Sequence, residues 1–189
     1  MKTTANYFDH ILEELKQSSV AISDAGTHAG DLLAEKLSAA ASVFVGGAGR
    51  SGLMGKAFAM RLMHMGVTSH VIGETVTPGI GQGDWLVLGS GSGETGSLVA
   101  MAQKARQAGA QVAVVTIKPE STLGQFADVT VVLPGATKEQ HNGQRGSIQP
   151  MASLFEQSLL LFYDALVLKL MELKGQDSAN MYGKHANLE

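Results

Sequence analysis

The chain of 189 residues contains no cysteine, and this absence removes a whole group of chemistries. Disulfides, thiol nucleophiles and thiolate metal sites are all excluded. Opposite charges nearly balance, with 14 Lys and Arg against 17 Asp and Glu, and the basic residues are scattered. A nucleic-acid-binding face would require a concentrated basic stripe. We therefore expect no nucleic-acid partner, and chemistry carried by carboxylates, histidines, lysines, hydroxyl groups or the backbone.

Long apolar runs are missing as well. No stretch approaches the roughly 20 apolar residues that a membrane helix requires, and the first ten residues contain no apolar signal core. The hydrophobic fraction is 44%, which is enough for one domain with a sizeable core. We expect a single domain over residues 1–189, a cytoplasmic location and no membrane partner.

Short apolar runs alternate with helix-forming segments along most of the chain. Strands alternating with helices predict βαβ units, and strands without in/out alternation predict a parallel sheet covered on both faces. The predicted fold class is α/β, a three-layer α-β-α sandwich with a five-stranded parallel sheet. The expected strands are 42–45, 69–72, 84–88, 112–117 and 129–133, and the expected helices are 4–24, 28–40, 53–65, 95–108 and 150–173.

The two ends of the chain differ in character. Apolar residues in helical spacing place N-terminal helices within about residues 4–40. Pro150 suits the first position of the last long helix, which is apolar almost all round and therefore predicts burial against another subunit. The tail, about residues 175–189, has no periodicity, and disorder is the ordinary interpretation of such a segment.

A loop rich in glycine and hydroxyl groups, GSGSGET, follows the strand predicted at 84–88. Its backbone amides, its hydroxyls and the start of the next helix would form a cradle for a phosphate monoester. The loop is not a nucleoside-triphosphate loop, because Glu94 follows Gly93 where that motif needs lysine. The alternative is a plain strand-to-helix turn with Thr95 as N-cap. The predicted phosphate-binding residues here are Ser90, Gly91, Ser92, Gly93, Glu94 and Thr95.

The other glycine loop, GGAGRSG at residues 46–52, satisfies the pattern GxGxxG between a strand and a helix. Glu74 follows at about the distance of a ribose-binding acid, so a dinucleotide site and a nicotinamide-dependent oxidoreductase compete. The chain has no room for a separate substrate domain, and such a site leaves the serine loop unexplained. Ligands of doubly wound sheets lie beyond the C-terminal strand ends, so Ser51 can converge with the serine loop on one phosphate. Arg50 either neutralises that phosphate or lies at the surface.

Several longer blocks carry a resemblance over nearly the whole chain. They are GAGRSGLMGKAFAMRLMHMG (47–66), GETVTP (73–78), GSGSGET (89–95), QPMASLFEQ (149–157) and MYGKHANLE (181–189). They resemble the flavodoxin-like sugar isomerase (SIS) superfamily and, within it, the 6-phospho-3-hexuloisomerase family. The glycine loops alone indicate the superfamily, whereas LFEQ and HANLE single out the isomerase. Lys184 departs from the pattern, since arginine is expected before His185, and the change would lose a bidentate fork.

The resemblance implies isomerisation of 6-phospho-3-hexulose to fructose 6-phosphate through a cis-enediol, in the ribulose monophosphate pathway of formaldehyde assimilation. It also implies a homotetramer that uses neither a metal nor an organic cofactor. The reaction needs a base that moves a proton between C2 and C3, and donors for the enediolate oxygen. The alternative is a non-catalytic phosphosugar-sensing module, which would need an attached DNA-binding domain; the first 40 or so residues are not basic.

Glu156 is the candidate catalytic base. It lies early in the predicted last helix, between Phe155 and a leucine-rich block, where desolvation would favour proton uptake. The resemblance over residues 153–157 points to the same residue. The alternative is a surface glutamate near a helix start, but counted from Pro150 it lies beyond the first turn, where the helix dipole has largely decayed.

The histidines divide into candidates and structural residues. His64, near the C-terminal end of its helix, is assigned ring opening or proton shuttling across a subunit interface; the alternative is a histidine favoured there by the helix dipole. His185, in the tail, is a possible rival from a segment that closes the site. His10, His28 and His70 are interpreted as structural, and His141 and Arg145 as part of a solvated loop that could act as a lid.

Overall fold

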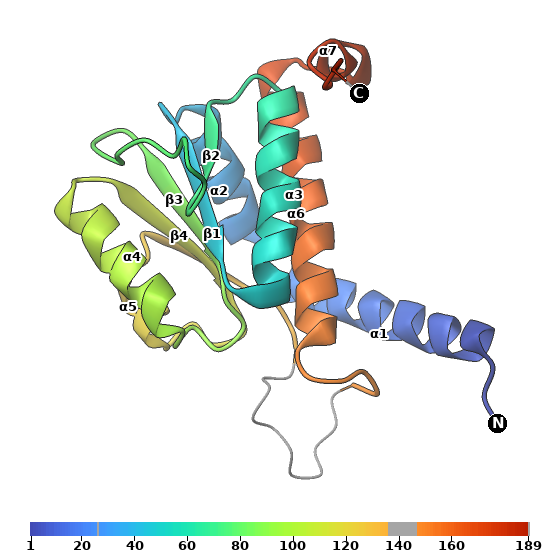
Figure 1. The fold of residues 1–189 in the computed structure, drawn as a ribbon. Coiled ribbons are helices and arrows are strands. Elements are labelled where there is room, and N and C mark those ends of the chain that lie inside the picture. Colours follow the sequence, from blue (N-terminus) through green and yellow to red (C-terminus); the bar gives the residue numbers. More distant parts are fainter. Residues whose placement is uncertain (26, 136–146, 189) are drawn as a thin grey trace.

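The computed structural model describes residues 1–25, 27–135 and 147–188 (Figure 1). A five-stranded parallel sheet has the order β2-β1-β3-β4-β5, which is a flavodoxin-like, doubly wound arrangement. This confirms the predicted fold class. The strands are β1 (Val43–Gly47), β2 (Ser69–Val71), β3 (Trp85–Gly89), β4 (Gln111–Thr116) and β5 (Val129–Val132).

Alternate residues of the buried strands serve two separate cores. Val43 and Val45 pack with α2 (Thr27–Ser38), α3 (Gly49–His64) and α6 (Ser153–Lys174) on one face of the sheet. Phe44, between them, packs on the other face, where α4 (Gly96–Gln107) and α5 (Thr122–Phe126) lie. Both faces are therefore covered, which explains the apolar runs without alternation.

Two short helices escaped the sequence prediction, because five residues are too few for a periodic pattern. They are α5 and α7 (Ser178–Tyr182), and each begins after a side-chain cap: Ser121 accepts from the Gly124 N–H, and Asp177 accepts from the Asn180 N–H. Helix α7 lies in the tail that shows no periodicity. Helix α1 (Thr4–Ala25) extends away from the sheet, as Figure 1 shows.

Helix α6 begins later than the sequence predicted. Pro150 does not occupy its first position; the Ser153 N–H donates to the Pro150 carbonyl in a turn, and Met151 has a φ of 57°. The later start places Glu156 in the first helical turn. Leu159 and Leu170 are fully buried, but Leu161 and Leu168 are exposed, so part of the apolar surface of α6 is uncovered in the single chain.

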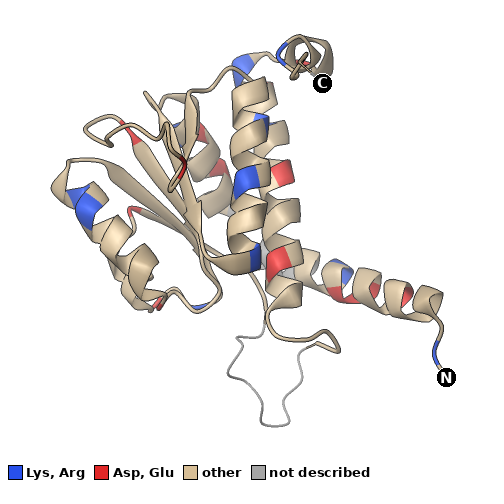
Figure 2. Cartoon of the chain, in the orientation of Figure 1, with Lys and Arg blue, Asp and Glu red and all other residues tan. Residues whose placement is uncertain are grey.

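Figure 2 shows Lys and Arg interspersed with Asp and Glu along the described helices. Of those helices, none combines the length and the hydropathy that a membrane span requires. Within the same residues, no group of three or more His, Asp and Glu side chains is placed to hold a metal ion.

Candidate functional site

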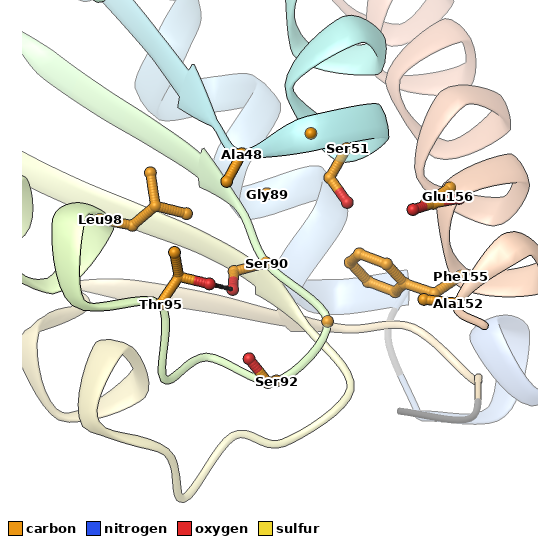
Figure 3. A pocket seen from close by; sticks show the side chains of 12 residues that line it. Ala48, Ser51, Gly89, Ser90, Ser92, Thr95, Leu98, Ala152, Phe155 and Glu156 are labelled. Carbon is orange, nitrogen blue, oxygen red and sulfur yellow. Dashed lines mark hydrogen bonds between the residues drawn. The ribbon is translucent and has the colours of Figure 1, made fainter. Parts of the chain in front are cut away.

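Three helix starts converge on one cavity of about 200 Å³ beyond the C-terminal ends of β1 and β3 (Figure 3). The start of α3 contributes Ala48, Gly49 and Ser51; the start of α6 contributes Ala152, Phe155 and Glu156. The serine loop, defined here as residues 89–95, and the start of α4 form the remaining wall. Because helix starts carry free N–H groups and a positive dipole end, this cavity suits a small anion such as a phosphate monoester.

The serine-loop hydroxyls line the cavity and do not cap helix α4. Thr95 is the N-cap of α4, but its side chain makes no capping hydrogen bond; its Oγ1 lies 3.5 Å from Ser90 Oγ. Ser90 Oγ accepts from the Gly93 N–H at 3.2 Å, and Ser92 Oγ accepts from the Glu94 N–H at 3.2 Å. No described residue accepts a hydrogen bond from Ser92 Oγ. A plain capping turn would use the Thr95 hydroxyl, so the loop is organised differently from that alternative.

Two predicted ligands in the serine loop support it from behind. The Glu94 carboxylate accepts from the hydroxyl and the N–H of Thr122, at 2.7 and 2.8 Å, and these bonds lower the pKa of Glu94. Gly93 has a φ of 67°, and a Cβ there would collide with Ser121. Neither Glu94 nor Gly93 lines the cavity, whereas Ser90, Gly91, Ser92 and Thr95 do.

Glu156 lies across the cavity from the serine loop, and its side chain is directed into the cavity, as is that of Ser51 (Figure 3). Only 7% of Glu156 is exposed, so the surface-glutamate alternative is wrong about its environment. Arg50 Nη1 donates to Glu156 Oε2 at 3.0 Å, while about half of the Arg50 side chain is exposed. Arg50 therefore approaches the site as the partner of the carboxylate.

The GxGxxG pattern has a packing explanation. A Cβ on Gly52 would lie 2.7 Å from the Gly47 carbonyl oxygen, so both glycines allow α3 to start close against the end of β1. Glu74, the candidate ribose ligand, pairs with Lys56 at 3.5 Å on the surface and does not line the cavity. Nothing in this geometry requires a dinucleotide.

The two candidate histidines lie together, but at the opposite end of α3 and α6 from the cavity (Figure 1). The rings of His64 and His185 stack with centroids 5.4 Å apart. His64 lies thirteen positions after Ser51 on α3, a rise of roughly 20 Å. Burial lowers the pKa of His64, and so do the charges of Arg61 and His185. Within one chain, His64 does not share the cavity with Glu156.

The remaining described histidines lie away from the cavity, in different environments. His10 and His28 are exposed, and the His70 ring packs on Phe44 with centroids 4.9 Å apart. His141 and Arg145 lie outside the described residues.

Sequence reasoning missed several residues that shape these sites. Phe155 and Ala152 line the cavity beside Glu156. Arg61, three residues before His64, contacts its ring. The spacing of three residues on one helix is a signal that could have identified Arg61, since such residues are neighbours on the helix surface.

Glu14 of α1 holds the segment that leads into α6. Its carboxylate accepts from the Ile148 N–H at 2.6 Å, the Ser147 hydroxyl at 2.8 Å and the Gln149 side chain at 2.9 Å. Partial burial raises the pKa of Glu14, but these hydrogen bonds outweigh it, so the pKa is lowered. The contact fixes the chain just before cavity-lining Ala152.

We expect Glu14→Gln to lower the free energy of unfolding at pH 7 by about 1–2 kcal/mol, because hydrogen bonds to a charged acceptor are lost. A lowered pKa stabilises the fold above the ordinary carboxyl pKa, and this contribution is lost as the pH falls through the folded-state value. The difference from wild type should therefore shrink in acid. Urea unfolding at pH 7 and in acid, below the ordinary carboxyl pKa, measures this difference in the free energy of unfolding. The control is Glu13→Gln, since Glu13 is exposed. An equal cost at both pH values would contradict the prediction.

Comparison with known proteins places this geometry in a family. Residues 36–168 match the SIS domain family. The chain is 53% identical to the 3-hexulose-6-phosphate isomerase of Bacillus subtilis (strain 168) over 189 residues, all of both chains. It is 44% identical to the 3-hexulose-6-phosphate isomerase of Mycobacterium gastri over 158 residues, covering 84% of this chain and 79% of that one.

A solved structure agrees. It is a Methanococcus jannaschii crystal structure from which a molecular function of 3-hexulose-6-phosphate isomerase was inferred. It superposes with a TM-score of 0.83 at 30% identity, covering 97% of this chain and 99% of that chain. Strand order, helix layers and sequence identity over the full length lead to one conclusion: this chain belongs to the SIS domain family.

Proposed function

We propose that this protein is an isomerase that interconverts 3-hexulose 6-phosphate and fructose 6-phosphate. The observation that carries the proposal is one cavity with a hydroxyl-lined loop on one side and the buried Glu156 carboxylate on the other. The full-length identity of 53% to a protein of that name supports the same substrate. The proposed reaction would belong to the ribulose monophosphate pathway.

In the proposed mechanism, the phosphate lies in the serine loop and receives hydrogen bonds from Ser90, Ser92, Thr95 and Ser51. Glu156 removes the C2 proton of the 3-ketose, a cis-enediol forms, and the proton is returned to C3. C2 is oxidised and C3 is reduced within one molecule, so the reaction is an intramolecular oxidoreduction that needs no external electron carrier. Arg50 holds Oε2, which leaves Oε1 as the proton-accepting oxygen.

His64 would act from a neighbouring copy in a homotetramer. It lies at the far end of α3 from its own chain's cavity, so it reaches a substrate only in another subunit's site. The exposed leucines of α6, Leu161 and Leu168, support burial of this helix against another copy. In this assignment His64 assists ring opening, while His185 packs against it.

Fructose 6-phosphate incubated with the protein in deuterated water tests the reaction. We expect NMR to show deuterium at C2 of a newly formed 3-ketose and at C3 of recovered fructose 6-phosphate, because the enediol exchanges its proton with solvent. A mixture that forms no 3-ketose, although the protein binds fructose 6-phosphate, would contradict catalysis and favour a sensing role.

The double variant Ser90→Ala/Ser92→Ala should weaken fructose 6-phosphate binding by about 10²–10⁴-fold, because each of the two lost hydrogen bonds to a charged group is worth roughly 1.5–3 kcal/mol. Calorimetric titration measures the affinity, and exposed Ser97→Ala, on the neighbouring helix, is the matched control. If unphosphorylated fructose bound the unmodified protein as tightly as its 6-phosphate, the serine loop would not be a phosphate site.

A further inference from the structure

The contact between Arg61 and His64 determines which ring nitrogen carries the proton. Arg61 Nη1 lies 3.3 Å from His64 Nδ1, one helical turn away on α3. A guanidinium group has only donors and stays charged, so His64 Nδ1 must offer a lone pair to it. An imidazole that accepts through Nδ1 is neutral and carries its proton on Nε2.

The groups around His64 favour the same state. His64 is 5% exposed, and the His185 ring stacks both on it and on the Tyr182 ring, the latter with centroids 6.3 Å apart. Asp164 of α6 lines the same cavity, and the Lys184 ammonium packs on Gly66 just beyond α3. Burial lowers the pKa of His64, and so do the charges of Arg61 and His185, which disfavours the imidazolium form.

We infer that Arg61 is a positioning residue that holds His64 as the neutral imidazole protonated on Nε2. Since His64 lines a cavity of about 450 Å³, and no described residue accepts a hydrogen bond from its Nε2, that N–H is available to another molecule. The inference rests on the proposed function for its catalytic meaning: His64 would enter the neighbouring site as a hydrogen-bond donor to a sugar oxygen, and Glu156 would remain the base.

Nitrogen-15 NMR of the full-length protein labelled at histidine tests the tautomer directly. His185 is an internal reference, because its Nδ1 lies 3.0 Å from the Ala186 carbonyl oxygen and must donate to it, the opposite tautomer. We expect an unprotonated Nδ1 and a protonated Nε2 for His64 at neutral pH, with assignment by loss of its signals in His64→Gln. A protonated Nδ1 in His64 of the unmodified protein would overturn the inference, whatever the activity.

Substitutions separate positioning from folding. Arg61→Lys keeps a charged donor and should keep the tautomer, whereas Arg61→Met should allow both tautomers. We expect Arg61→Met to lower kcat about tenfold with KM unchanged. The acid limb of kcat/KM should move to higher pH, because loss of the Arg61 charge raises the pKa of His64. An unchanged tautomer and an unchanged pH profile in Arg61→Met would contradict the inference. Full activity of His64→Gln with the expected NMR pattern would instead refute only the catalytic role of His64.

Discussion

Replacement of Glu156 by glutamine is expected to lower kcat by about 10²–10⁴-fold while leaving fructose 6-phosphate binding nearly unchanged. Glutamine preserves the shape and can still accept the hydrogen bond from Arg50, but its amide cannot take a proton from carbon. The serine loop, on the opposite side of the cavity, is untouched by the change. The loss should therefore appear in the chemical step.

Steady-state kinetics and calorimetric binding of fructose 6-phosphate together measure this separation. Glu172→Gln is the matched control, because Glu172 is exposed on the same helix and, among the described residues, its side chain pairs only with Lys169. Thermal unfolding of both variants checks the fold. Losses of equal size in affinity and in rate would show that Glu156 supports the site structurally and would refute its role as the base.

Mixing two inactive variants should restore activity if the site is shared between subunits. We expect His64→Gln alone to lower kcat by about 10²-fold. In tetramers assembled from His64→Gln and Glu156→Gln chains, some sites receive an intact Glu156 from one chain and an intact His64 from another. Random assembly of equal amounts should return roughly a quarter of the wild-type activity.

The mixture requires assembly from unfolded or co-expressed chains, since preformed oligomers need not exchange subunits. Each variant assembled alone is the baseline, and sedimentation of the unmodified protein establishes the oligomeric state. Recovery no greater than the average of the two baselines would place Glu156 and His64 in separate functions. A monomer at micromolar concentration would exclude the shared site altogether.

The sequence alone determined the architecture and the meeting of the two glycine loops at one cavity, the candidate site. Runs such as residues 85–88 and 112–115 are apolar at every position, which only a strand buried on both faces accommodates. Because parallel strands end at one edge of a sheet, two glycine loops after two such strands had to lie near each other. Local patterns of this kind depend on backbone preferences and burial, and both are readable over a few residues.

Only the tertiary structure decided which side chains act together. Glu94 and Ser92 are two residues apart, yet one is bound by Thr122 of α5 and the other faces the cavity. Glu156 meets Arg50 across 106 positions, and the His64 ring meets that of His185 across 121 positions. Such pairs depend on how helices that are distant in sequence pack on a common sheet, and no local periodicity encodes that packing.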